Sequence, residues 1–467
     1  MPTVHAPRCL VAVAVLLIGG SAIVAPSPSL AIGPNGFTVA RAATAFDAML
    51  AAYWQPASQT FYARSDHQVR PGHAATADFW WTAELWEAVI DAAEAHVPAA
   101  DRMLLDATYD GFVAGSPTLD SDFNDDRGWW ALAAIRAYAL TGELRYLARA
   151  ESLSDDQWRS WDSTYGGGLW WRRSVHDQKN VATNAPAAMT AALIYAATGS
   201  EAYLDRATQL YRWLASRLRS GSGVADHVSG GGDGTVDGSS YTYDEGAYIG
   251  AAVALYQATG EPSYLDDAED VASGVIAATP GRVLPDEGQG DGGGFKGILV
   301  RDLAALVTVD RSGSLRAFLA ANADAAWAHR RGDGLSGPSW SATPGPGSID
   351  SLTDASAVAL FSVVVVIGAT PGHPTSVVDP GPSSVSTTMA ASRSRLASWA
   401  ATGEAPSQVA PAKARDPRLG PEVGVGFVIL VAALVCLIGR CRLTLRRPGS
   451  SVVHTIPQQD DMRARRR

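Results

Sequence analysis

A repeated pattern in the middle of the chain constrains the fold more than any other feature. Each copy has an apolar run that ends at Thr-Gly, a short polar turn, and then Tyr-Leu-x-x-Ala. Glycine after an apolar helical run is typical of a left-handed C-cap, and the Tyr-Leu segment opens the next helix. The glycines of successive copies lie 57 and 61 residues apart, so one period is one helical hairpin with its loop. The three copies are Leu140–Ala150, Ala197–Ala207 and Ala258–Ala268.

The length of this hairpin predicts the architecture of the whole domain. A domain over residues 36–370 has room for about six hairpins, and stacked repeats bury a shared core. We therefore predict an all-α fold, an (α/α)6 barrel in which the hairpins close into a ring with long Gly-rich loops on the binding side. An open solenoid of the same hairpins is the alternative. The predicted helices flanking the turns are 129–140, 186–197, 248–258, 203–217 and 264–277.

Both ends of the chain have the composition of targeting segments. Arg8 precedes the apolar run Cys9–Ile18, as in a secretory signal peptide. Near the other end a segment rich in Pro, Ser, Thr and Ala is followed by an uncharged apolar stretch and a basic tail. We expect an exported single-pass cell membrane protein with its large domain outside the cell. The predicted segments are the signal peptide 1–31, the linker 371–421, the transmembrane helix 423–439 and the cytoplasmic tail 440–467.

Composition excludes several classes of function. Acidic residues outnumber basic ones by 47 to 37, which argues against a nucleic-acid partner. The three cysteines, Cys9, Cys436 and Cys441, lie outside the predicted domain, so it is not a disulfide scaffold. The nine histidines include no pair at metal-ligand spacing, and we expect neither a metal nor a cofactor. Gly288–Gly293 spells G-x-G-x-x-G without a preceding strand and is interpreted as a loop.

The clearest chemistry is the aspartate pair Asp125-Asp126, which stands directly before an apolar helix together with Trp129-Trp130. Acidic residues at a helix start are often only caps. Neighbouring carboxylates, however, oppose double ionisation, so one is poised as an acid and the other as a nucleophile. Adjacent residues more easily reach the short carboxyl spacing of retaining glycosidases than the wider inverting spacing.

Tryptophan and lysine usage adds candidates for sugar binding. Tryptophan outnumbers phenylalanine by 14 to 10 and occurs in adjacent pairs, suited to stacking on flat sugar faces. Core packing is the alternative for about half of them, although neighbours on a helix cannot both face one core. Only two of the three lysines, Lys179 and Lys296, lie in the predicted domain; they are either selected for a compact charge or there by chance.

These segments together resemble glycoside hydrolase family 76, bacterial α-1,6-mannanases with relatives among fungal cell-wall transglycosidases. The resemblance rests on the aspartate pair with Trp-Trp-Ala-Leu-Ala and Ile-Arg-Ala-Tyr-x-Leu-Thr-Gly behind it. It continues through Gly167-Gly168-Leu-Trp-Trp171, Lys179-Asn180 to Asn184-Ala-Pro186, Tyr241-Thr-Tyr243, and Phe295-Lys296-Gly297 with Arg301. It implies an (α/α)6 barrel and retaining chemistry, with Asp125 as nucleophile and Asp126 as proton donor. Where the family commonly has Tyr-Asn-Gln-Gly, this chain has Tyr243-Asp244-Glu245-Gly246, which leaves the subsite contacts and the preferred substrate open.

The sequence therefore predicts a surface-tethered retaining glycoside hydrolase, endo-acting on the α-1,6-linked mannan of envelope or exogenous glycans. The alternatives are an envelope-remodelling transglycosidase and a non-catalytic glycan-binding protein. We expect a monomer with a mannose-containing glycan and the membrane as partners. The residues predicted to bind the sugar are Trp80, Trp81, Trp129, Trp130, Trp171, Lys179, Asn180, Asn184, Tyr241, Tyr243, Asp244, Asp291, Phe295 and Lys296.

Overall fold

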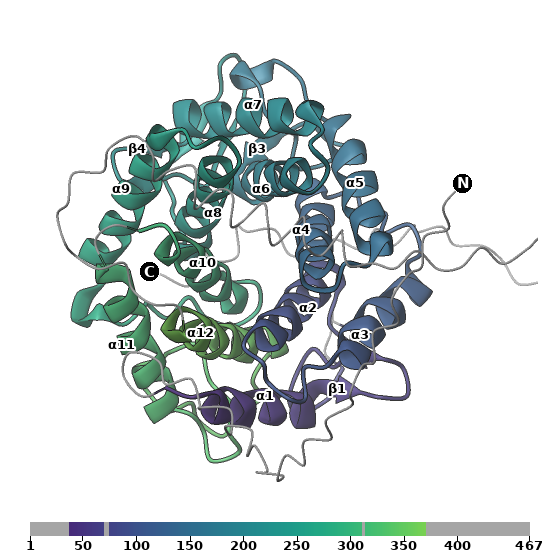
Figure 1. Ribbon diagram of the computed structural model, residues 1–467, viewed down its shortest axis with the longest axis vertical. Helices are drawn as coiled ribbons and strands as arrows, with labels where there is room; N and C mark the ends of the chain where they lie inside the picture. The colour runs from purple at the N-terminus through teal and green to yellow at the C-terminus, as the bar shows by residue number, and fades with distance from the viewer. Residues whose placement is uncertain (1–36, 70–73, 311–312, 370–467) are drawn as a thin grey trace, which may run out of the picture. The chain divides into compact units, whose positions relative to one another are not determined.

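The computed structural model of the protein describes residues 37–69, 74–310 and 313–369 (Figure 1). The predicted signal peptide, linker, transmembrane helix and cytoplasmic tail lie outside these described residues. One described helix, α12 Ser351–Ala369, is long and apolar enough to cross a membrane, but 83% of its apolar stretch is buried inside the folded domain. Such burial is typical of a core helix of a soluble domain.

Twelve α-helices among the described residues alternate along the chain between two concentric rings (Figure 1). The prediction of a mostly helical domain is confirmed, and α12 packs against α2, so the first and last inner helices lie side by side. The outer helices are α1 Val39–Tyr53, α3 Arg102–Gly115, α5 Leu144–Trp158, α7 Glu201–Arg217, α9 Pro262–Ala278 and α11 Ser314–Ala328. The inner helices are α2 Phe79–Glu94, α4 Asn124–Thr141, α6 Val181–Thr198, α8 Thr242–Thr259, α10 Gly292–Val307 and α12 Ser351–Ala369.

The Thr-Gly repeat forms the turns that lead from inner to outer helices. Helices α4, α6 and α8 end at the threonines, and the glycines that follow have φ of 73°, 74° and 75°. A side chain is strained in this left-handed region, which explains why glycine recurs there. Each glycine N–H donates to the tyrosine carbonyl four residues earlier, so the predicted C-caps are confirmed at Gly142, Gly199 and Gly260.

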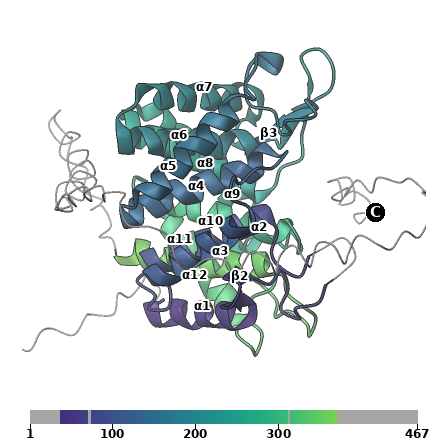
Figure 2. The same ribbon diagram turned by 90° about the vertical axis from the view of Figure 1, so that its right-hand side faces the viewer.

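The connections differ strongly between the two ends of the barrel. Inner helices pass to outer helices through short turns, whereas most outer helices return through long loops, three of which carry the small strands. The exception is the short segment 116–123 between α3 and α4. These loops gather at one end, which we call the loop face (Figure 2). All six inner helices begin there, so their positive dipole ends favour anionic groups on that face. The strands are β1 Trp54–Gln55, β2 Thr60–Phe61, β3 Gln178–Asn180, β4 Arg219–Ser220, β5 Gly223–Val224, β6 His227–Ser229 and β7 Thr235–Asp237.

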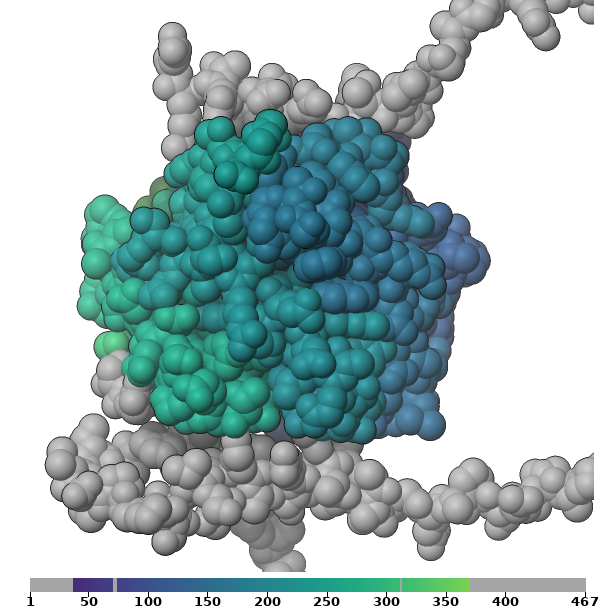
Figure 3. Space-filling view, turned by 90° about the horizontal axis from the view of Figure 1, so that it is seen from above, coloured from purple at the N-terminus to yellow at the C-terminus, as the bar shows by residue number. Residues whose placement is uncertain are grey.

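The strands form three small antiparallel sheets, with orders β1-β2, β3-β6-β7 and β4-β5. The middle sheet joins two loops, because β3 precedes α6 whereas β6 and β7 precede α8. Seen from the side of α7, the outer helices cover the inner ring (Figure 3). The helices thus form the wall of the barrel, and the irregular segments are concentrated on the loop face.

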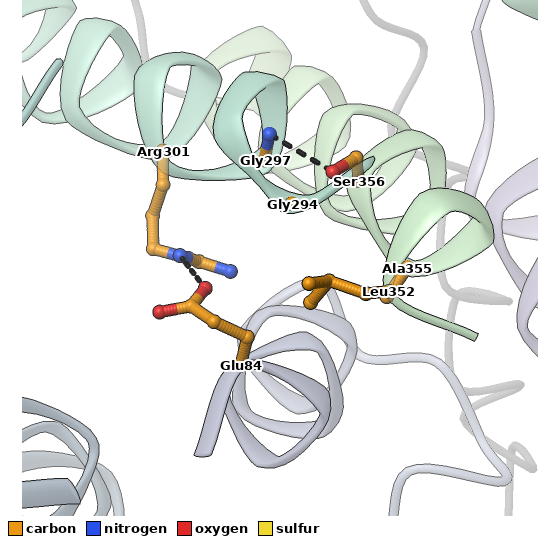
Figure 4. Close-up of a pocket in the computed structure, with 7 residues that line it drawn as sticks. All are labelled: Glu84, Gly294, Gly297, Arg301, Leu352, Ala355 and Ser356. Carbon is orange, nitrogen blue, oxygen red and sulfur yellow. Dashed lines mark hydrogen bonds and ion pairs between the residues drawn. The ribbon is translucent and has the colours of Figure 1, made fainter. Parts of the chain in front are cut away.

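Glycines let α10 approach α12 closely around a narrow crevice between α2, α10 and α12 (Figure 4). A Cβ at Gly294 would lie 2.8 Å from the Leu352 side chain, and one at Gly297 would lie 2.9 Å from Ser356 Oγ. The Ser356 hydroxyl accepts from Gly297 N–H at 3.1 Å. The loop predicted at Gly288–Gly293 is thus partly wrong, because α10 already begins at Gly292 and needs its glycines for packing.

Candidate active site

The aspartate pair lies in the first turn of α4, on the loop face. Asn124, the residue before the pair, is hydrogen-bonded to the loop that carries Trp170 and Trp171. Asn124 N–H donates to Trp171 O at 2.7 Å, and its side-chain amide donates to Trp170 O at 2.8 Å. Two chain segments about 45 residues apart in sequence therefore hold Asp125 and Trp171 in a fixed register.

Asp125 is held by neutral donors. Trp171 Nε1 donates to Asp125 Oδ2 at 2.8 Å, and the N–H of Asp126 donates to Oδ1 at 3.0 Å. Burial raises the pKa of Asp125 to about 6, while these two hydrogen bonds act in the opposite direction. Asp125 is therefore the member of the pair that ionises first.

Asp126 has the higher pKa of the two. Ser121 Oγ donates to Asp126 Oδ2 at 2.7 Å. Burial and the neighbouring Asp125 raise the pKa of Asp126 to about 8, against the opposing hydrogen bond of Ser121. Near neutral pH the pair thus combines an ionised Asp125 with a protonated Asp126, which is the combination that a nucleophile and a proton donor require.

Two further aspartates, at the starts of two other inner helices, interact electrostatically with the pair. Asp291, at the N-cap position of α10, accepts from Trp81 Nε1 at 2.9 Å and from Trp80 Nε1 at 3.2 Å, both on the same oxygen. Asp78 caps α2 through the N–H of Trp81 at 3.2 Å. Desolvation by the surrounding protein atoms, and then the negative charge of Asp291, raise the pKa of Asp78 to about 7. Three inner-helix N-termini on the loop face therefore carry carboxyl groups that are close enough to influence one another electrostatically.

Asp78 and Ser121 are not among the site residues predicted from the sequence. Asp78 stands immediately before Phe79-Trp80-Trp81, and an aspartate at that point is a usable N-cap signal. Ser121 has no comparable signature. Its contact with Asp126 depends on the turn that the chain makes before α4.

Lys179 lies in the interior of the loop before α6 and not on a sugar-binding surface. Its ammonium group donates to Asp162 Oδ1 at 2.7 Å and to the backbone carbonyls of Asp162, Thr164, Gly167 and Gly168 at 2.8–3.0 Å. The side chain is fully buried. The prediction that Lys179 contacts substrate is corrected: it fixes the loop that presents Trp171.

Asn180 and Asn184 have the same kind of structural role, and both are buried. Asn180 caps α6 by accepting from Thr183 N–H at 3.1 Å. Asn184 accepts from Leu169 N–H at 2.6 Å and donates to Leu169 O at 3.1 Å. The Asn184 amide is fully engaged within the protein, and the Asn180 oxygen serves as a helix cap in a side chain that is only 3% exposed, so the predicted sugar contacts are corrected to structural roles.

The aromatic and acidic residues predicted on α8 and α10 lie together. Phe295 packs against Tyr241 and Tyr243 at ring distances of 5.5 and 4.7 Å, and of these three only Tyr241 is more than slightly exposed. Asp244 is fully buried and accepts from Tyr241 N–H at 2.8 Å, so its predicted sugar contact is corrected to a helix cap. Burial raises the pKa of Asp244 well above its ordinary value.

Lys296 is also buried, which corrects its predicted sugar contact. Its ammonium group donates to Pro338 O and lies 4.4 Å from the Trp340 ring centre. Burial lowers the pKa of Lys296 to about 8.

The adjacent tryptophans of α4 point in different directions. Trp130 is completely buried, stacks on Phe112 and donates to Phe79 O at 2.9 Å, so it is a packing residue and its predicted sugar contact is corrected. Trp129 is 4% exposed and lines an interior cavity of about 270 Å³ whose other lining residues come from further along the inner helices.

Of the predicted binding residues, the structure brings Trp80, Trp81, Trp171 and Asp291 close to the aspartate pair. Among the described residues, no group of three His, Cys, Asp or Glu side chains could hold a metal ion.

Comparison with known proteins places the chain in a family. The sequence model of glycosyl hydrolase family 76 matches residues 38–369, which is the whole double ring of helices. The chain belongs to glycosyl hydrolase family 76. Among solved structures, the α-1,6-mannanase GH76A of Salegentibacter sp. HEL1_6 is 30% identical with a TM-score of 0.66, covering 70% of this chain and 99% of that one.

Two further relatives carry information on ligands and activity. An inactive variant of the Salegentibacter enzyme, with two consecutive aspartates replaced by asparagine, was solved with α-1,6-mannotriose at the same identity, coverage and TM-score. The mannan endo-1,6-alpha-mannosidase DCW1 of Saccharomyces cerevisiae is 29% identical over 153 residues, 29% of this chain and 34% of that protein. The matched region thus spans about a third of the length of this curated relative.

Proposed function

We propose that this family 76 protein is a retaining, endo-acting hydrolase of α-1,6-linked mannan. The observation that carries the proposal is the asymmetry within the aspartate pair. Asp125 accepts two hydrogen bonds from neutral donors and ionises first, whereas Asp126 keeps its proton to about pH 8. A carboxylate and a carboxylic acid side by side are the two groups that retaining glycoside cleavage needs.

The proposed reaction has two steps. An ionised Asp125 oxygen attacks the anomeric carbon and forms a glycosyl ester, while Asp126 gives its proton to the leaving glycosidic oxygen as that bond breaks. Asp126, now a carboxylate, takes a proton from water, whose oxygen attacks the anomeric carbon and releases Asp125. The Trp171 indole holds Asp125 in place through both steps.

The relatives support the substrate class. The Salegentibacter mannanase loses activity when two consecutive aspartates are changed and binds α-1,6-mannotriose in that form. This chain likewise has two consecutive aspartates, at the start of an inner helix. The yeast relative is named as an endo-acting enzyme on the same linkage. We further propose that the enzyme is held at the outer face of the cell membrane by the apolar segment 423–439, which rests on the sequence.

The full-length protein should be incubated with linear α-1,6-mannan and the products followed by chromatography. A ladder of short oligosaccharides is expected from the native chain and from the outer-ring control Asp205→Asn, but not from Asp125→Asn. If longer products form when an acceptor glycan is added, the enzyme is a transglycosidase and the assignment as a hydrolase is wrong. If the protein binds mannotriose but cleaves no mannan, it is a glycan-binding protein and the assignment as an enzyme is wrong.

A further inference from the structure

Two adjacent tryptophans on the first turn of α2 converge on one oxygen atom. Trp80 and Trp81 both donate their indole N–H to Asp291 Oδ1, at 3.2 and 2.9 Å. Successive residues on a helix point about 100° apart, so their convergence requires an acceptor placed between them. Asp291 supplies it from another inner helix, at the N-cap position of α10. The indole orientations are therefore set by this carboxylate across the mouth of the barrel.

Asp291 also carries charge that no neighbouring cation cancels. Its side chain is exposed on the loop face, and among the described residues the structure records neither an ion pair for it nor a hydrogen bond to its Oδ2. The Asp291 charge acts on Asp125, Asp126 and Asp78, the carboxyl groups at the starts of α4 and α2. Asp291 thus lies close enough to the aspartate pair to influence a charge that develops there.

We propose that Asp291 is a positioning residue that fixes Trp80 and Trp81 as an indole platform for the sugar and stabilises positive charge at the reacting mannosyl ring. The inference rests on the proposed function. The transition state of glycoside cleavage is oxocarbenium-like, and a carboxylate that is held in a fixed position nearby favours this developing positive charge over the neutral ground state. The platform affects sugar binding, whereas the charge affects the chemical step.

Two substitutions separate these two effects. Asp291→Asn keeps an oxygen that can accept from both indoles but removes the negative charge. Asp291→Ala removes both. The control is Asp205→Asn, which removes an exposed carboxylate from the outer helix α7. All variants are made in the full-length chain, and their kinetics are measured on linear α-1,6-mannan.

For Asp291→Asn we expect kcat to fall about 10- to 100-fold with little change in KM. We expect Asp291→Ala to show that loss and a raised KM as well. The alkaline limb of the pH profile should move to lower pH in both variants, because Asp126 loses a like-charged neighbour. Asp125 on α4, Asp78 on α2, and the adjacent Arg127 and Ser121 still face Asp126 and are common to all variants.

Native kcat and an unmoved pH profile in Asp291→Asn would overturn the electrostatic part of the proposal. The platform is tested separately by mannotriose binding in an Asp125→Asn background, where no turnover occurs. Affinity should be kept in Asp125→Asn/Asp291→Asn and lost at least about fivefold in Asp125→Asn/Asp291→Ala. Equal affinity in these two double variants would overturn the positioning part. If native protein binds mannotriose without cleaving mannan, the proposed function fails while the platform is still decided by the binding comparison.

Discussion

Two groups of carboxyl groups occupy the same inner ring and have different surroundings. Glu84, Glu87 and Asp91 on α2 pair with Arg136 and Arg301, which reach them from α4 and α10; we call these five residues the interior network. Arg301 contacts Glu84 at 3.0 Å and Asp91 at 2.9 Å. The aspartate pair on the loop face instead has only neutral hydrogen-bond donors and is partly exposed.

Burial raises carboxyl pKa values in both groups, to about 7 for Glu87 and about 8 for Asp126. A raised pKa therefore does not by itself distinguish a reactive acid from a structural one. The distinction lies in access and in the partner. A guanidinium bound to a buried carboxylate neutralises its charge, whereas an indole or a hydroxyl holds a carboxyl group without neutralising it. The comparison predicts that the first group sustains folding and the second sustains chemistry.

The largest expected effect is on activity at Asp125. Asp125→Asn should lower kcat on α-1,6-mannan by about 10⁴-fold or more, because the covalent intermediate cannot form. Its urea unfolding curve should stay close to that of the native chain. A normal rate, or a loss of activity that unfolding explains entirely, would contradict the catalytic role of Asp125.

The interior network should respond in the opposite way. Arg301→Leu should lower the free energy of unfolding by about 3–5 kcal/mol, because buried carboxylates lose their cation. The control Arg159→Met breaks an exposed pair with Asp156 and should change it by less than about 1 kcal/mol. Urea denaturation of both variants makes the measurement. A fully stable Arg301→Leu protein would contradict the structural role of the network.

Lys179 distinguishes residues that contact the sugar from residues that stabilise the loops around the site. Lys179→Met should lower the free energy of unfolding by about 3 kcal/mol, because the buried carbonyls around the ammonium group lose their donor. Activity should fall with it as Trp171 loses its fixed position. A raised KM in a protein of unchanged stability would instead restore the direct sugar contact that the sequence predicted.

The smallest expected effect is a gain in stability. The folded pKa of Asp126 lies above its ordinary value of 3.8, so the group opposes folding increasingly as pH rises from about 4 to about 8. Asp126→Asn removes this penalty and should stabilise the domain at pH 9, after allowance for solvent screening, by on the order of 1 kcal/mol. At pH 3.5 it should not. Unfolding curves at the two pH values that show the same difference would argue against the raised pKa.

The sequence predicted the features that depend on neighbouring residues. Thr-Gly turns at Gly142, Gly199 and Gly260 follow from local helix capping, and the hairpin spacing was enough to predict the number of helices. Asp125 and Asp126 are likewise neighbours in the chain, so they lie side by side whatever fold the chain adopts. These predictions needed no knowledge of which chain segments meet.

The predictions that failed concern side chains whose surroundings come from distant segments. Lys179 was predicted to meet sugar, but the preceding loop folds its carbonyls around the ammonium group. Trp130 and Trp129 are neighbours, yet the rings of helices give one a packing site and the other a cavity wall. The link from Asp291 to Trp80 and Trp81 spans about 210 residues of sequence, so no local pattern could reveal it.

The most direct test of the account is the configuration of the first product released from α-1,6-mannan or a mannotetraose, followed by proton NMR before mutarotation. An Asp125 nucleophile requires two displacements at the anomeric carbon, so the account predicts that the α-anomer appears first and that Asp125→Asn releases none. A β-anomer appearing first would mean direct attack by water and would contradict the roles given to the aspartate pair.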